Sequence, residues 1–268
     1  LCAGQSNMVM PLNGFDYCPI SDSNNVIADA PNHPGIRMVT IKPTVKLSPQ
    51  EYAEGSWQQP TTENAPKFSA AAYHYALTLQ RTLQIPIGVI TCAWGGSRVE
   101  GWLPKEILQT YKDEDLTLIG SDKTPVYLQS MLMYNGILYP CHKYTIKGFI
   151  WYQGESNVRS SRTYAERLAT MVKHWRSIWK QGDLPFYYVE TVPFACEYKE
   201  DGYIGALLRE AQQKALSLIP NSGMIGTNDL VETYEAPQVH PHNKKGIGER
   251  LAYMSLNKTY GYQGIESE

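Results

Sequence analysis

Four short segments of this 268-residue chain carry the residue types that serine-dependent acyl transfer requires. They are residues 4–8 (GQSNM), 94–97 (WGGS), 153–157 (QGESN) and 239–241 (VHP). Together they supply a serine hydroxyl, glycines whose backbone N–H groups a substrate can approach, side-chain amides and an imidazole. Acyl transfer needs a nucleophile, an adjacent base and donors that hold an oxyanion. The segments therefore predict Ser6 as a nucleophile and His240 as its base.

Each of these residues also has a simpler structural interpretation. Ser6 could cap the N-terminus of a helix that follows a strand, and Gly95 with Gly96 could form a plain tight turn. Gln153 could be a buried amide that binds loop backbone, and His240 could lie on the surface in a turn bounded by proline. The catalytic interpretation gains weight because all four segments fall at the predicted strand ends of one sheet.

Strands and helices alternate along most of the chain. Strands are predicted over 35–41, 85–92, 146–152, 186–192 and 224–227, and helices over 68–84, 130–139, 160–180, 205–218 and 243–256. Residues 1–4 have the pattern of the end of one further strand. This alternation predicts an α/β fold in which helices cover both faces of a parallel sheet. Ligands bind such sheets at the carboxyl ends of the strands, where the four segments lie.

Residues 11–66 interrupt the regular pattern. They are rich in Pro, Asn, Asp and Ser, and they are too long for a simple connection in a compact domain. We therefore expect one catalytic domain over 1–268 with a long irregular insertion over 11–66, which could serve as a lid. The start inside a strand indicates a truncated N-terminus, so the lack of a signal peptide does not place the chain in the cytosol.

Composition excludes several classes of protein. The chain is 43% hydrophobic and has 24 Lys+Arg against 26 Asp+Glu, which argues against disorder and against a basic nucleic-acid-binding surface. It has no stretch of about 18 apolar residues that could span a membrane. The five cysteines form no CxxC pair, and His240-x-His242 has no carboxylate at the usual ligand spacing. We therefore expect neither a metal nor another cofactor, while the oligomeric state stays open.

The segments resemble the conserved blocks of the sialate O-acetylesterase family, which belongs to the SGNH hydrolases. The matching blocks are GQSNM (4–8), WGGS (94–97), WYQGESN (151–157) and HP…K…GERLA (240–252), with YNG (134–136), WR…W (175–179) and LPF (184–186) between them. The resemblance covers residues 4 to about 262. It implies a three-layer α/β/α, flavodoxin-like domain with a parallel sheet of about five strands. It also implies removal of O-acetyl groups from sugars by a secreted or periplasmic bacterial enzyme.

The resemblance assigns roles to individual residues. Ser6 matches the family's nucleophile and His240 its base. The backbone N–H groups of Ser6 and Gly96 and the side-chain amide of Gln153 are the expected oxyanion donors, with Asn157 as the second choice for the amide. Sialic acid is the leading sugar, and acetylated xylan or another acetylated glycan is the close alternative. A glycan-binding module that has lost its chemistry is the alternative from another class.

One position departs from the pattern of many SGNH enzymes. They carry an aspartate three residues before the catalytic histidine, and this chain has Pro237 there. Either a backbone carbonyl orients His240, or a carboxylate comes from elsewhere. The carboxylates nearest in sequence are Glu235, Glu232 and Asp229. We favour a Ser–His dyad, because a neutral carbonyl can also fix the histidine tautomer.

Arg98 is the candidate for recognising an anionic sugar. It follows the glycine turn, and a guanidinium there could bind the carboxylate of sialic acid. The alternative is a structural ion pair of Arg98 with Glu100 or Glu155. Glu155 has no role in acyl transfer, and we expect it to hold its loop close to the substrate site.

Aromatic side chains offer a second route to sugar binding. The chain has 19 Tyr and 6 Trp but only 5 Phe, which suits either a tyrosine-rich core or a polar cleft that stacks on sugar rings. Trp94, Trp102 and Trp151 lie in or beside the blocks and could line such a cleft. Trp151 sits at a strand end, which favours a core position.

Overall fold

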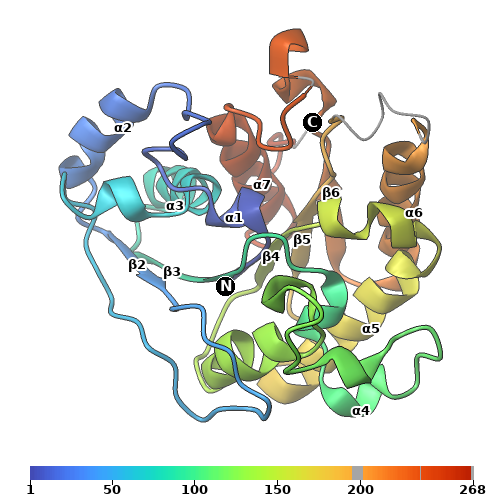
Figure 1. Ribbon diagram of the computed structural model, residues 1–268. Coiled ribbons are helices and arrows are strands. Elements are labelled where there is room, and N and C mark those ends of the chain that lie inside the picture. Colours follow the sequence, from blue (N-terminus) through green and yellow to red (C-terminus); the bar gives the residue numbers. More distant parts are fainter. Residues whose placement is uncertain (195–201, 236, 267–268) are drawn as a thin grey trace.

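The computed structural model describes residues 1–194, 202–235 and 237–266, and a parallel sheet forms its centre (Figure 1). The strands are β1 (Cys2–Gly4), β2 (Ile36–Thr40), β3 (Ile87–Ala93), β4 (Phe149–Tyr152), β5 (Phe186–Val189) and β6 (Ser222–Ile225). They run in the order β2-β3-β1-β4-β5-β6, and every pair is parallel. The predicted parallel α/β sheet is confirmed, with six strands where about five were expected.

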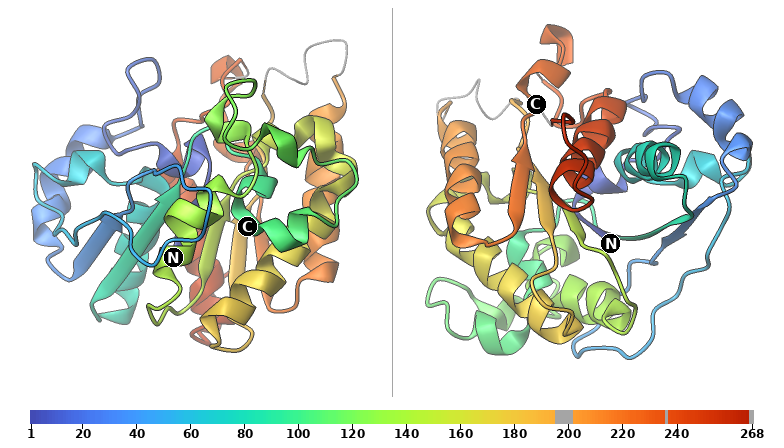
Figure 2. Two further views of the ribbon diagram at one scale, coloured as in Figure 1. Left: turned by 60° about the horizontal axis from the view of Figure 1, so that its bottom comes forward. Right: turned by 180° about the vertical axis from the view of Figure 1, so that it is seen from behind.

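Helices cover both faces of the sheet (Figure 2). They are α1 (Ser6–Val9), α2 (Ser23–Asp29), α3 (Ala70–Leu83), α4 (Lys105–Leu108), α5 (Ser161–Trp179), α6 (Ile204–Leu218) and α7 (Lys244–Lys258). Side chains alternate along β4: Phe149 and Trp151 join the core under α5 and α6, and Ile150 and Tyr152 join the core under α3 and α7. This period of two produces the three layers.

Local signals fix the ends of the longer helices close to the predicted positions. The Ser69 side chain accepts a hydrogen bond from the N–H of Ala72 and caps α3, and Asn243 caps α7 through the N–H of Gly246. The predicted helix over 130–139 differs more. Its last part is a π-helical segment, Tyr134–Leu138, followed by the 3₁₀ turn Tyr139–Cys141. Pro140 lies in that turn and has no N–H to continue the helix.

Residues 11–66 belong in part to the sheet layer. They hold α2 and the edge strand β2, whose Ile36 pairs with Ile87 of β3. Most of residues 42–59 are exposed irregular backbone. A role of the segment as a lid stays a prediction.

The topology brings three of the four predicted segments together. β3, β1 and β4 are neighbours, so residues 4–8, 94–97 and 153–157 leave the same edge of the sheet. β1 and β4 approach closely at Gly4, where an added Cβ would lie 2.1 Å from the Tyr152 carbonyl oxygen and φ is +143°. Only glycine fits there. The fourth segment arrives in the loop between β6 and α7.

Candidate active site

Ser6 and His240 form a hydrogen-bonded pair. Ser6 Oγ and His240 Nε2 lie 2.8 Å apart, although 234 residues separate them in the chain. Ser6 is the first residue of α1, Gln5 occupies the N-cap position, and no side chain caps this helix. The N-cap interpretation of Ser6 is therefore wrong. With the histidine proton on Nδ1, Nε2 accepts the serine proton, as a general base does.

No described residue orients the other ring nitrogen. His240 is 7% exposed, and its buried Nδ1 has no hydrogen-bond partner among the residues that the structure describes. The Glu235 carboxylate accepts hydrogen bonds from the N–H groups of Glu232 and His242 instead. Asp229 pairs with an arginine of α7, and Glu232 is exposed. Both expectations, an orienting carbonyl and an orienting carboxylate, are therefore wrong within the described residues.

A buried network holds the backbone on both sides of the histidine. Asn7, the residue after the nucleophile, donates from Nδ2 to the carbonyl oxygen of Val239 (2.8 Å) and to Glu155 Oε1 (2.6 Å). Lys244 Nζ donates to Asn7 Oδ1 (2.7 Å) and to the carbonyl oxygen of Pro241 (2.9 Å). Two carbonyls that flank the histidine are thus tied to the helix that carries the serine.

Burial shifts the protonation of this network. Burial lowers the pKa of Lys244 to about 7, against an opposing attraction from Glu155, while burial raises the pKa of Glu155. Lys244 Nζ also lies 5.4 Å from the centre of the Tyr152 ring. Burial, with the Lys244 charge as a second cause, lowers the pKa of His240 to about 4. The imidazole is therefore neutral and able to accept a proton near pH 7.

Two backbone N–H groups next to the nucleophile are the expected oxyanion donors. Gly95 packs against the nucleophile, since a Cβ added there would lie 3.7 Å from Ser6 Cβ. Gly96 follows with φ of +73°, a conformation that glycine adopts without strain. Within the described ranges, neither the N–H of Ser6 nor that of Gly96 has a hydrogen-bond partner. Both are available to bind a developing negative charge.

The predicted side-chain amides have other partners. Gln153 Nε2 donates to the carbonyl oxygen of Ser97 (3.1 Å) and to Asn157 Oδ1 (2.7 Å), and its Oε1 accepts from Tyr164. Asn157 Nδ2 donates to Glu100 (3.0 Å). Because their amide groups are bound in this way, Gln153 and Asn157 stabilise the turn that contains Gly95 and Gly96. Their assignment as oxyanion donors is not upheld by this arrangement.

Comparison with known proteins bears on this site. A family model described as "Carbohydrate esterase, sialic acid-specific acetylesterase" matches residues 1–257. The chain belongs to this family. The resemblance seen in the sequence blocks is confirmed.

Relatives of this carbohydrate esterase family member include sialate O-acetylesterases. The one from Homo sapiens is 25% identical over 292 residues, covering 100% of this chain and 54% of that protein. The one from Mus musculus is 24% identical, covering 99% of this chain and 57% of that protein. The chain thus spans about half the length of the curated relatives it matches.

Solved structures share the fold. A carbohydrate acetylesterase from Xanthomonas citri superposes with a TM-score of 0.83 at 31% identity, over 97% of this chain and 56% of that one. A protein from Arabidopsis thaliana superposes with a TM-score of 0.57 at 18% identity, over 95% of both chains, which shows a shared fold alone.

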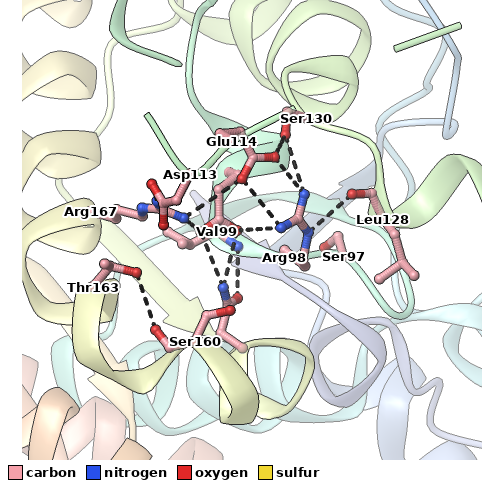
Figure 3. Close-up of polar contacts among 12 residues, drawn as sticks. Ser97, Arg98, Val99, Asp113, Glu114, Leu128, Ser130, Ser160, Thr163 and Arg167 are labelled. Carbon is pink, nitrogen blue, oxygen red and sulfur yellow. Dashed lines mark hydrogen bonds and ion pairs between the residues drawn. The ribbon is translucent and has the colours of Figure 1, made fainter. Parts of the chain in front are cut away.

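Arg98 is held in an ion-pair network beside the site (Figure 3). Its Nη2 lies 2.6 Å from Glu114 Oε1, and its Nε donates to the carbonyl oxygen of Leu128. Glu100 lies farther away, at 3.8 Å, and its main partner is Arg167 at 2.5 Å. Because Glu114 already pairs with the guanidinium, this arrangement gives no support to the clamp for a sugar carboxylate, which stays a prediction. The structural ion pair is present, with Glu114 in place of Glu100 or Glu155.

The predicted tryptophans divide between core and surface. Trp102 and Trp151 are fully buried and, with Trp175, form an edge-to-face cluster with ring centres 5.6–6.4 Å apart. They belong to the core and cannot contact a sugar, while Trp94 is partly exposed. Glu155 is buried against Asn7 and is not a substrate contact.

Lys244 belongs to the HP…K…GERLA block, but no role is predicted for it from the sequence, and one signal could have pointed to one. A lysine at the first position of a helix opposes the helix dipole, so its presence there calls for a specific partner. Lys244 is the first residue of α7.

Among the described residues, no three His, Cys, Asp or Glu side chains gather as a metal site. In that same part of the chain, no helix is long and apolar enough to cross a membrane. Cys196 lies outside the described residues.

Proposed function

We propose that this chain is a carbohydrate O-acetylesterase that works through an acetyl-enzyme on Ser6. The observation that carries the proposal is the 2.8 Å hydrogen bond between Ser6 Oγ and His240 Nε2 at the carboxyl edge of the sheet. Family membership and the name of the Xanthomonas citri neighbour support the same chemistry. A non-catalytic glycan-binding module has no need of this pair.

The reaction proceeds in two halves. Ser6 Oγ attacks the acetyl carbonyl carbon while His240 takes the serine proton, and the N–H groups of Ser6 and Gly96 bind the oxyanion. The bond from carbon to the sugar oxygen then breaks, and that oxygen takes the proton from His240. Water then attacks the acetyl-enzyme and gives a proton to His240, the bond between Ser6 Oγ and the acetyl carbon breaks as Ser6 takes that proton back, and acetate leaves. Each oxyanion donor contributes about 3 kcal/mol to lowering the barrier.

His240 acts as one half of a dyad in this scheme. Its ring is held by the backbone tethers from Asn7 and Lys244, in place of a carboxylate on Nδ1. The tethers fix where Nε2 points, which is the requirement for efficient proton transfer.

The acetylated sugar is most simply a sialic acid, as the family description and the names of the relatives suggest. One observation favours the alternative of a neutral acetylated glycan such as xylan: Arg98 is already neutralised by Glu114. We further propose a secreted or periplasmic location, as the family resemblance implies.

Acetate release tests the proposal. Wild-type protein and Ser6→Ala are compared on acetylated sialic acid, acetylated xylan and ethyl acetate, with Ser177→Ala, an exposed serine of α5, as the matched control. We expect Ser6→Ala to lose activity to background and Ser177→Ala to match wild type. Equal rates for wild type and Ser6→Ala would refute the esterase function, and the panel identifies the preferred sugar.

A further inference from the structure

The sugar must lie next to His240 when the ester bond breaks. This step rests on the proposed function: the histidine returns its proton to the sugar oxygen, which requires that oxygen within about 3 Å of Nε2. When the ester is on a ring hydroxyl, the pyranose ring is then only one bond farther away. Whatever side chains border His240 toward solvent are therefore the first to contact the sugar.

Two aromatic side chains border His240. The Phe15 ring packs edge-on against the imidazole with centres 5.2 Å apart, and the Tyr17 ring lies 6.1 Å from it. Phe15 and Tyr17 stack on each other at 5.6 Å with their planes 22° apart. Tyr17 is 67% exposed although it is a large aromatic residue. One face of its ring thus rests on Phe15, and the other faces solvent beside the catalytic base.

The turn that carries these rings is anchored to the histidine itself. Phe15 and Cys18 exchange two backbone hydrogen bonds of 2.9 Å, which closes a tight turn around Tyr17. Cys18 Sγ lies 3.1 Å from the carbonyl oxygen of His240, and the N–H of Ser21 donates to the carbonyl oxygen of His242. The platform and the base therefore keep a fixed relation to each other, which is what a preorganised subsite requires.

We propose that Tyr17, backed by Phe15, is the stacking platform for the pyranose ring that carries the acetyl ester. An exposed aromatic face offers apolar contact to the C–H face of a sugar, while its hydroxyl end can stay hydrated. Tyr127 borders the other side of the site: a Cβ added at Gly96 would lie 2.6 Å from its ring. The subsite recognises a sugar ring by shape and needs no charge on it.

A comparison of two esters separates the platform from the chemistry. We measure kcat/KM for a monoacetylated pyranoside and for ethyl acetate, which has no ring, in wild type, Tyr17→Ala, Tyr17→Phe and Tyr52→Ala. Tyr52 is 89% exposed and serves as the control for removing a surface tyrosine. We expect Tyr17→Ala to lose about tenfold on the pyranoside and to match wild type on ethyl acetate. Tyr17→Phe keeps the ring and should keep both activities, as should Tyr52→Ala.

Each of the other possible results of this comparison points to a single conclusion. Equal losses of Tyr17→Ala on both esters would show that Tyr17 supports His240 and would overturn the subsite. Unchanged activity on both esters would overturn it as well. If wild type and Ser6→Ala release acetate equally, the proposed function itself fails, and this result is independent of Tyr17. Loss of activity in Tyr17→Phe, with the ring retained, would replace stacking by a hydroxyl contact.

Discussion

Replacing Lys244 by methionine tests whether the buried network positions His240 for catalysis. Methionine keeps most of the side-chain volume but removes the ammonium that donates to Asn7 Oδ1 and to the carbonyl oxygen of Pro241. The carbonyl of Val239 keeps its bond from Asn7. The change therefore releases one of the two backbone tethers beside His240.

Two opposing contributions decide the effect on stability. The pKa of Lys244 falls from 10.5 to about 7 through burial, and at about 1.4 kcal/mol for each pKa unit this is roughly 5 kcal/mol against holding the ammonium there. The methionine variant is free of this cost. In the variant, however, two buried acceptors lose their donor, which costs about 1–3 kcal/mol each. The contributions nearly cancel, so we expect the free energy of unfolding to change by less than about 2 kcal/mol. For a chain of this size that is a Tm shift within about 8 °C.

The effect on activity should be much larger. A displacement of about 1 Å in a catalytic group can lower the rate by roughly 100-fold, and the loop that carries His240 loses one tether. Removing the Lys244 charge also removes the second cause of the low pKa of His240. We therefore expect kcat/KM near pH 7 to fall on the order of 100-fold, and the acid limb of the pH profile to move from about 4 toward 6.5.

Rate and melting measurements on the same samples check this prediction. kcat/KM for ethyl acetate is followed from pH 3.5 to 8, and thermal melts are recorded across the interval between the two Lys244 pKa values, about 7 and 10.5, with Lys258→Met at the exposed end of α7 as control. Because Lys244 binds its proton less tightly in the folded state, wild-type stability should gain from a rise in pH between about 7 and 10.5. The variant should lose that gain. A variant with wild-type kcat/KM and an unmoved acid limb would refute the positioning role, and a collapse of Tm would refute the energy balance.

Three further predictions follow from the site geometry. In wild type, the acid limb of kcat/KM should lie near pH 4, because burial keeps His240 neutral below the usual histidine pKa; a midpoint at 6.5 or above would contradict this. Gly96→Ala should lower kcat/KM about 100-fold, because its Cβ would meet the Tyr127 ring at a φ of +73°. Adding Tyr127→Ala should restore part of the loss, and a fully active Gly96→Ala would remove Gly96 from the oxyanion hole. Arg98→Ala should destabilise the fold by about 1–3 kcal/mol, because it removes the closest charged partner of the Glu114 carboxylate, which keeps only Ser130 and the more distant Arg167, as urea unfolding would measure. The ratio of activities on acetylated sialic acid and a neutral sugar acetate should not change, and a selective loss on sialic acid would restore the carboxylate clamp.

The nucleophile and base could be predicted from the sequence because parallel sheets have a simple geometry. Strands that neighbour each other in a parallel sheet end at the same edge, so residues after those ends meet whatever their separation in the chain. Ser6 lies two residues after the end of β1, and the loop after β6, which is not a neighbour of β1, brings His240 to it. Their catalytic roles stay a proposal, but strand order places both segments at the same edge of the sheet. The helix predicted over 68–84 is observed over Ala70–Leu83, and the cap at Ser69 that sets its start is an equally local feature.

The direction of a polar side chain could not be predicted in this way. Gln153 occupies the expected strand end, but its amide turns toward Asn157 and the carbonyl of Ser97 because those partners lie there in three dimensions. Arg98 pairs with Glu114 across a segment of short turns, and no hydrophobic periodicity in the sequence predicts how that segment folds back. Lys244 and Lys245 stand side by side at the start of α7, and Lys244 is nonetheless fully buried. In each case, partners distant in sequence decide whether a polar group faces the substrate or the protein.

The low pKa of His240 has opposite consequences for the two proton transfers of the proposed reaction. A base with a pKa of about 4 accepts the serine proton weakly, which slows the attack. The imidazolium that results is a correspondingly strong acid, and it has no partner on Nδ1 among the described residues to hold the charge. It therefore returns its proton readily to a departing sugar oxygen, which is a poor leaving group without one. The aryloxide of an aryl acetate leaves without taking a proton, so an aryl ester gains nothing from this acid. We therefore expect the rate acceleration over the uncatalysed reaction to be larger for a sugar acetate than for an aryl acetate.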